Sequence, residues 1–101
     1  MTKLTIYYVD FEKTNRDDRW DASMGKFIGV DKITKIGTYE AKNDENPLYE
    51  AFEEFNIGNR GGYRVRSMSV GDVVVWNGTA YICAGAGWDK LELDVEKDLG
   101  E

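Results

Sequence analysis

Residues 66–83, RSMSVGDVVVWNGTAYIC, contain the signals that decide the fold. Val73 to Trp76 are β-branched or aromatic, which suits a pleated and packed strand. Asn77-Gly78 tolerates the positive φ angles of a type I′ turn, whose twist matches that of paired strands. Gly71 has a flexible backbone and the Asp72 side chain can cap a turn, so a turn is expected just before the first strand. The stretch therefore predicts a tight hairpin.

A two-residue turn also fixes which residues face each other. The strand Val73–Val75 should pair with Ala80–Ile82, so that Val74 lies opposite Tyr81 and Val73 lies opposite Ile82.

Further strands are expected on both sides of the hairpin. In Leu4 to Phe11 both alternating sets are apolar, which predicts a central strand covered on both faces. We favour a strand around Gly37 to Ala41, with two alternatives: a strand from Ile33 to Ala41, or a helical turn capped by Asp31. A last short strand is expected at Trp88 to Val95, after a glycine-marked bend at residues 84–87.

The principal helix is predicted from Pro47 to Asn56. Asn46 suits the capping position and Pro47 the first helical position. The spacing of Leu48, Phe52 and Phe55 predicts a buried stripe.

Glu12 to Asp21 is polar and is expected to be a loop, closed by Trp20 folding back onto the core. Carboxylates in and beside this loop suit a hard cation such as Mg²⁺ or Ca²⁺: Asp10, Glu12, Asp17, Asp18 and Asp21. They match no known metal-binding spacing and alternate with Arg16 and Arg19. We therefore favour a solvated loop that neutralises itself, with no metal.

These elements predict an α+β fold, with a curved antiparallel sheet of about four or five strands and one main helix packed on it. The 101 residues suit one domain, residues 1–95, followed by an acidic tail, residues 96–101.

The composition of the chain argues against several classes of function. A formal net charge of −6 disfavours general nucleic-acid binding. The absence of histidine removes the commonest general base and metal ligand, and a single cysteine can form neither an internal disulfide nor a zinc site. No signal peptide or membrane-spanning run is seen in the sequence, so we expect a cytoplasmic protein without cofactors.

The sharpest candidate site is an arginine loop. Residues 56–71 contain no acid although the chain is acidic. Guanidinium, hydroxyl and backbone groups there suit an anion or an acidic partner surface, with Arg60, Tyr63, Arg64, Arg66, Ser67 and Ser69 as candidates. The alternative is that the arginines pair with Glu50, Glu53 and Glu54 on the preceding helix. A second candidate is a partner surface made by Trp20, Trp76 and Trp88, whose alternative role is in the core.

Two blocks of the chain resemble the YodL-like family, small domains of bacteria, phages and mobile-element proteins. Residues 48–56, LYEAFEEFN, are similar to the family's helix ending in Phe-Asn. Residues 66–74, RSMSVGDVV, are similar to its Arg-Ser-Leu-Ser-Val-Ser-Asp-Val-Val signature, with Met68 and Gly71 as departures. Asn15-Arg16-Asp17 and Gly87-Trp88 also fit the family's order. The resemblance implies a small accessory protein and carries no catalytic mechanism.

We therefore expect a non-catalytic accessory protein of a phage or mobile element that binds a host macromolecule, most simply a host protein. The alternative is a small-ligand or nucleotide-binding module that uses the arginine and glycine loop. An enzyme relying on carboxylates, serine or lysine is the weakest of the three hypotheses.

Overall fold

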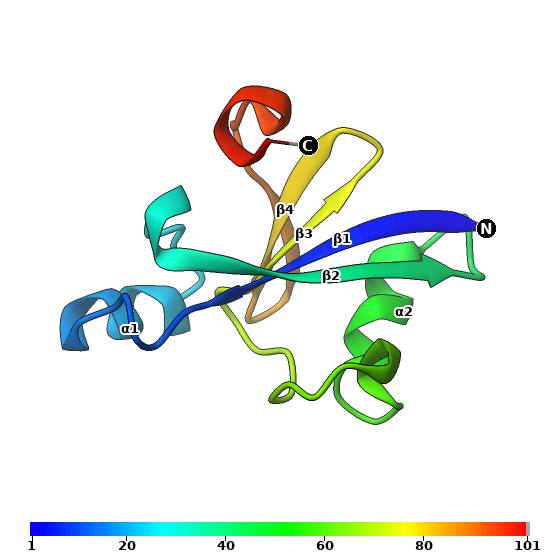
Figure 1. Cartoon of the computed structure of the whole chain (residues 1–101), viewed down its shortest axis with the longest axis horizontal. Coiled ribbons are helices and arrows are strands. Elements are labelled where there is room, and N and C mark those ends of the chain that lie inside the picture. Colours follow the sequence, from blue (N-terminus) through cyan, green and yellow to red (C-terminus); the bar gives the residue numbers. More distant parts are fainter. Residues whose placement is uncertain (101) are drawn as a thin grey trace.

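An antiparallel sheet of five strands forms the centre of the structure, a computed structural model that describes residues 1–100 (Figure 1). The spatial order is β2-β1-β3-β4-β5. The strands are β1 (Thr2–Val9), β2 (Ile33–Ala41), β3 (Val73–Trp76), β4 (Thr79–Ala84) and β5 (Gly87–Lys90). The two α-helices are α1 (Arg16–Ser23) and α2 (Pro47–Glu54). The predicted α+β class with a sheet and a packed helix is confirmed.

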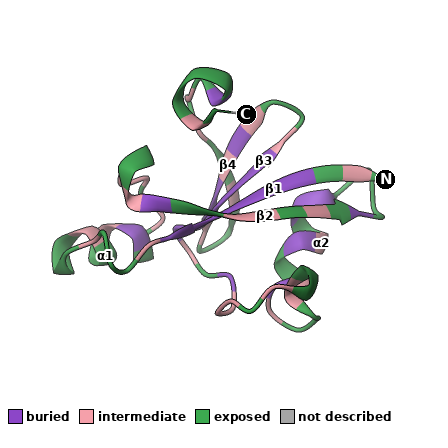
Figure 2. Ribbon diagram, viewed as in Figure 1, coloured by how far each residue is buried: buried purple, intermediate pink, exposed green. Residues whose placement is uncertain are grey.

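Strand β1 lies inside the sheet, between β2 and β3, as its two apolar faces predicted. Leu4, Ile6 and Tyr8 pack on the side that α2 covers, together with Phe55. Tyr7 and Val9 belong to the core on the opposite side. Figure 2 shows the buried residues concentrated along β1, β3 and β4. The sheet is thus covered on both faces, which explains why neither face of β1 is polar.

The predicted hairpin is confirmed in its register. Val74 pairs with Tyr81 and Val73 with Ile82. The two turn residues have positive φ, 53° for Asn77 and 78° for Gly78, as a type I′ turn requires. The turn residues and the strand residues favour the same hairpin, so it could be predicted without knowledge of tertiary contacts.

Helix α2 ends two residues earlier than predicted, and its buried stripe differs. Leu48, Ala51 and Phe55 are buried, whereas Phe52 is 37% exposed. The prediction that Phe52 is buried was therefore wrong. The small Ala51 lets the helix approach the sheet closely, and Phe55 packs edge-on against Tyr8 and Tyr39. That contact sets the rotation of the helix and leaves Phe52 at its rim.

The expected capping by Asn46 is also absent, since its side chain makes no cap hydrogen bond. The connection before α2 is held instead by Asn43, whose Oδ1 accepts from the backbone N–H groups of Glu45 and Asn46.

The charged segment expected to be a loop contains helix α1. Asn15 Oδ1 accepts from the Asp18 backbone N–H (2.8 Å), and the Asp18 carboxylate accepts from the Asn15 backbone N–H (3.1 Å). This reciprocal pair is a capping box, which starts the helix. The expectation that Trp20 folds onto the core was wrong. Trp20 is 68% exposed, and Ala22 is the residue of α1 that the core buries.

Strand β2 follows the longer of the two predicted strand ranges, Ile33–Ala41, after a 3-10 turn at Val30–Lys32. Its pairing with β1 shifts register between Ile6 and Tyr7, opposite Gly37. Gly37 has φ 157°, and a Cβ there would collide with the ring of Tyr63. Glycine therefore allows the Tyr63 hydroxyl to bond the backbone N–H and C=O of Thr38.

The C-terminal part of the chain differs from the expected strand and tail. Strand β5 ends at Lys90, and a helical turn, η3 (Val95–Leu99), follows. Val95 is buried and Leu99 packs against the core on the face opposite α2, while residues 96–98 are exposed. Val95 and Leu99 thus cover part of the sheet, while the acidic residues between them stay at the surface.

Candidate functional site

The most strongly organised polar group is a buried ion pair inside the predicted arginine loop. Both terminal nitrogens of Arg66 lie 2.8 Å from the two carboxylate oxygens of Asp72. Asp72 is completely buried at the start of β3, and 30% of the Arg66 side chain remains exposed. This parallel two-bond geometry is the strongest arrangement available to a guanidinium and a carboxylate.

The pair is tied to the backbone of its neighbours. Asp72 accepts from the backbone N–H groups of Val9 and Ser69, both at 2.9 Å. Arg66 donates to the carbonyls of Val9 (3.1 Å) and Ser67 (3.0 Å). Residues 66–69, which have no regular secondary structure, are thereby fixed against the end of β1.

Aromatic rings cover the guanidinium as well. The central carbon of Arg66 lies 4.3 Å from the ring centre of Tyr8 and 4.9 Å from that of Phe11. Each contact is within the range of a cation–π interaction. Arg66 is therefore held by charge, hydrogen bonds and stacking. Its contacts link residues 66–69 to the end of β1.

The other two arginines have different environments. Arg60 donates to the Ser67 hydroxyl (3.1 Å) and Arg64 is exposed. Within residues 1–100, neither forms an ion pair with a carboxylate of α2. The structure thus supports neither a single convergent cluster of three arginines nor their predicted pairing with the helix. The arginine partner found is Asp72, which directly follows the acid-free run.

The remaining predicted members of the loop serve local structure. Tyr63 bonds the backbone of Thr38, as described above. The Ser69 hydroxyl lies 3.5 Å from Arg66, at the limit of a hydrogen bond. In the described part of the chain, neither Tyr63 nor Ser69 forms a hydrogen bond with Arg64.

Two buried donors near Arg66 have no hydrogen-bond partner among the described residues, the hydroxyl of Tyr8 and Nε of Arg60. Burial, together with the charge of Asp72, raises the pKa of Tyr8 to about 12 against the opposing charges of Arg66 and Arg60. The hydroxyl therefore keeps its proton at neutral pH and can donate a hydrogen bond to a neutral or anionic acceptor.

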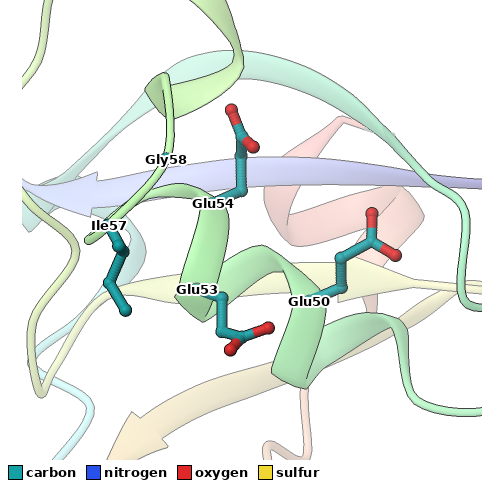
Figure 3. A pocket seen from close by; sticks show the side chains of 5 residues that line it. All are labelled: Glu50, Glu53, Glu54, Ile57 and Gly58. Atoms are coloured by element: carbon teal, nitrogen blue, oxygen red, sulfur yellow. The ribbon is translucent and has the colours of Figure 1, made fainter.

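Helix α2 carries three carboxylates on its polar side. Together with Ile57 and Gly58 they line a shallow hollow of about 290 Å³. In Figure 3 the side chains of Glu50 and Glu54 lie on one side of the helix ribbon, and that of Glu53 lies on the other. Glu54 accepts from the backbone N–H groups of Asn59 (3.1 Å) and Gly61 (2.9 Å).

Glu50 bridges α2 to the end of β2. It accepts from the Tyr39 hydroxyl (2.6 Å) and from the backbone N–H groups of Lys42 (3.0 Å) and Asn43 (2.7 Å). The Tyr39 hydrogen bond is the main cause that lowers the pKa of Glu50, with the two backbone bonds adding to it against desolvation. Burial raises the pKa of Tyr39, and the bond to Glu50 raises it further. The sequence analysis named Glu50 as a possible partner of the arginines and missed this bridge.

The three tryptophans do not form one surface. Trp76 and Trp88 are partly buried against the core under α2, where Trp76 lies 5.9 Å from the ring of Tyr81. Trp20 stands exposed on α1, beside a separate hollow lined by Arg16, Arg19 and Ser23. Figure 1 shows α1 and α2 towards opposite ends of β1 and β2. Only Trp20 is available as an exposed tryptophan.

The acidic residues near α1 serve local structure rather than a shared site. Asp10 accepts from Thr34 and from the backbone of Glu12. The Asp18 carboxylate completes the capping box of α1 and pairs with Lys32, and Asp21 pairs with Lys26. Among residues 1–100 no group of three His, Cys, Asp or Glu side chains is arranged to hold a metal ion.

Cys83 is buried in β4. Burial raises the pKa of its thiol to about 11, and the charge of Asp72 contributes. Such a thiol is protonated at neutral pH, so Cys83 is a poor nucleophile. In the described part of the chain, no helix has the length and apolar character needed to cross a bilayer.

The five-stranded sheet and its packed helices define a small α+β domain. The model of the YodL-like domain matches residues 10–92, so the chain belongs to the YodL-like domain family. Both Arg66 and Asp72 lie in the block that resembles the family signature. No curated protein and no solved structure matches the chain.

Proposed function

We propose that this chain is a non-catalytic accessory protein, encoded by a phage or mobile element, that acts in the bacterial cytoplasm by binding a host protein. The proposal combines the chemistry of the exposed surface with the setting that the family resemblance implies. It requires no cofactor.

One observation carries the proposal: large apolar side chains are exposed on the two helices, while the strongest polar groups are used within the fold. Trp20 on α1 is 68% exposed and Tyr49 on α2 is 56% exposed. Arg66 and Asp72, by contrast, satisfy each other and the adjacent backbone. Exposed aromatic side chains beside polar ones favour macromolecular contact, because aromatic residues dominate the energy of many interfaces.

Affinity capture from a bacterial lysate, followed by mass spectrometry, tests the proposal. We expect one host protein to be enriched by the wild-type chain and recovered in a fixed ratio to it. Binding of the purified partner should then be reproduced by isothermal titration calorimetry. Failure to enrich any protein over beads carrying an unrelated acidic domain would contradict the proposal.

A second candidate function, anion binding, is favoured by the donors left over at the arginine loop. Arg60 has a buried Nε without a partner, Tyr8 has an unpaired buried hydroxyl, and Arg64 is exposed. A phosphate or carboxylate group would accept hydrogen bonds from such donors. Titration calorimetry with inorganic phosphate and with ATP tests this function, comparing wild type with Arg60→Gln and Arg64→Gln.

Arg66 is kept in these variants, because replacing it would disturb the fold rather than the ligand. Binding that disappears in Arg60→Gln, with unchanged thermal stability, would favour the anion function. Absence of binding by the wild type at millimolar ligand would eliminate it.

A further inference from the structure

The outward side of α2 presents apolar side chains that no other part of residues 1–100 covers. Tyr49 is 56% exposed, Phe52 is 37% exposed, and Ile57, just after the helix, is 85% exposed. Phe52 and Glu53 lie three and four residues after Tyr49, which places both on the same side of the helix as Tyr49. We call Tyr49, Phe52, Glu53 and Ile57 the outer α2 face.

The charge on and around this face has one sign. From Asn43 to Asn59 the sequence contains five acidic residues and no Lys or Arg. Within residues 1–100, Glu50 and Glu54 accept from neutral hydroxyl or backbone groups and form no ion pair. Glu53 is exposed, and its carboxylate has no hydrogen-bond partner in the described part of the chain. The N-terminal amine offsets Asp44 and Lys42 acts on Glu50, so the negative charge that the protein leaves uncompensated is centred on Glu53.

The position of Glu53 is unfavourable for the isolated helix. Glu53 and Glu54 lie in the last turn of α2, which contains no basic residue. The carbonyl end of a helix carries partial negative charge, so carboxylates there are disfavoured. Glu54 is compensated by two backbone donors, whereas Glu53 gains nothing comparable. Departures from local rules without a structural gain are expected at functional sites.

We propose that the outer α2 face docks a basic amphipathic segment of a protein partner. Apolar side chains of the segment would pack on Tyr49, Phe52 and Ile57. Lysine or arginine side chains would enter the hollow lined by Glu50, Glu53, Glu54 and Ile57, with the aliphatic stem on Ile57 and the cation near the carboxylates (Figure 3). This inference rests on the proposed function and names the surface and the partner's chemistry.

Charge complementarity selects this occupant over the others. A second copy of the chain carries the same net charge of −6, and stacking two outer α2 faces would oppose like charges. A nucleic-acid backbone or an anionic membrane would be repelled for the same reason. A basic segment would instead be attracted at long range and would release the apolar surface from water.

The test uses the full chain and a synthetic peptide with Leu and Lys placed at helical spacing. Titration followed by amide NMR spectra should give shifts centred on residues 49–57. A peptide with Ser in place of Leu should bind much more weakly, and one with Glu in place of Lys should not bind. Shifts centred on α1, equal binding of the Ser peptide, or no binding at all would overturn the inference.

A matched pair of variants makes the test specific. The double variant E53Q/I57S should weaken binding of the Leu/Lys peptide at least about tenfold, from loss of one charge and one apolar contact. The control E92Q/M24S makes the same chemical changes at exposed positions elsewhere and should leave the affinity within about twofold of wild type. Equal weakening in both variants would show nonspecific charge attraction and overturn the inference.

The same variants separate this inference from the proposed function. If the wild type and E53Q/I57S capture the same host protein equally well, the outer α2 face is not the docking site. The proposed function is still supported by that result. Peptide binding at the face, with no host protein captured, would support the face and count against the proposed function. Amide spectra of E53Q/I57S that keep the wild-type dispersion ensure that lost binding is not lost folding.

Discussion

The Arg66–Asp72 pair and the outer α2 face are both charged, but their charges are arranged in opposite ways. Asp72 is buried, and it accepts from Arg66 and from two backbone N–H groups, while two aromatic rings cover the arginine. On the outer α2 face, the exposed Glu53 carboxylate has no hydrogen-bond or ion-pair partner among residues 1–100. The first arrangement is complete within the chain, and we propose that the second is completed by a cation from a partner.

The difference shows how to separate structural charges from charges available for binding. A buried charge must be compensated inside the protein, because its desolvation is costly. An exposed charge is stabilised by water and can exchange that water for a partner. Each substitution below tests whether its charge or ring belongs to the first class or the second, in order of decreasing effect on stability.

Asp72→Asn should lower the free energy of unfolding by about 3 kcal/mol, because it leaves the Arg66 guanidinium partly buried without its counter-charge. Urea denaturation measures the change. Asp89→Asn, at an exposed position of β5, is the control and should change stability by no more than about 0.5 kcal/mol. A loss below about 1 kcal/mol in Asp72→Asn would show that the pair contributes little to folding.

Glu50→Gln should cost about 1–2 kcal/mol at pH 7, since it weakens three hydrogen bonds to a carboxylate that solvent still reaches. The folded protein lowers the pKa of Glu50 from its ordinary value of 4.5, so this stabilisation is present above that value. It is lost as the pH falls through the folded-state pKa. Urea unfolding of wild type and variant should therefore converge between pH 6 and pH 3. A difference that grows on acidification would contradict the role of the ionised carboxylate.

Phe52→Ala should lower stability by about 1 kcal/mol, because a side chain at the rim loses only part of its burial. Phe55→Ala, on the buried side of the same helix, should cost several times as much. Thermal and urea unfolding of the two variants measure the contrast. Equal losses would show that Phe52 belongs to the core and would remove it from the outer α2 face.

Glu53→Gln should leave stability unchanged or raise it by about 0.3–0.5 kcal/mol, since it removes a carboxylate from the negative end of α2. The melting temperature should then rise by about 2 °C in a domain of this size. A clear fall would mean that Glu53 contributes to folding, and its charge would no longer mark a partner site.

The features predicted correctly from the sequence are those with a local cause. Asn77-Gly78 fixes the hairpin register through its own backbone preference, and the two apolar faces of Leu4 to Val9 identify a central strand. Helix α1 was missed because only Ala22 is buried, so its sequence has no apolar stripe. The signal that was present is the capping-box spacing of Asn15 and Asp18.

The candidate site depended on contacts that no local pattern determines. Arg66 was grouped with Arg60 and Arg64 because they share an acid-free run, but its partner Asp72 lies just beyond that run. The exposure of Phe52 results from the close approach of Ala51 to the sheet, which depends on Tyr8 and Tyr39 in other strands. Both features depend on where other segments of the chain lie in space. The spacing of residues in the sequence was therefore not enough to predict them.

The central place of β1 has a consequence for the order of folding. Its neighbour β2 follows after a short interval, but its other neighbour β3 comes from the last third of the chain, with Leu4 opposite Trp76. The β3–β4 hairpin can close early, whereas joining it to β1 requires a long loop to be ordered first, and such non-local pairing is slow. We therefore expect the β1–β3 contact to limit the refolding rate. Stopped-flow measurements should show Val74→Ala slowing refolding, while Tyr39→Phe, in β2, acts mainly on unfolding.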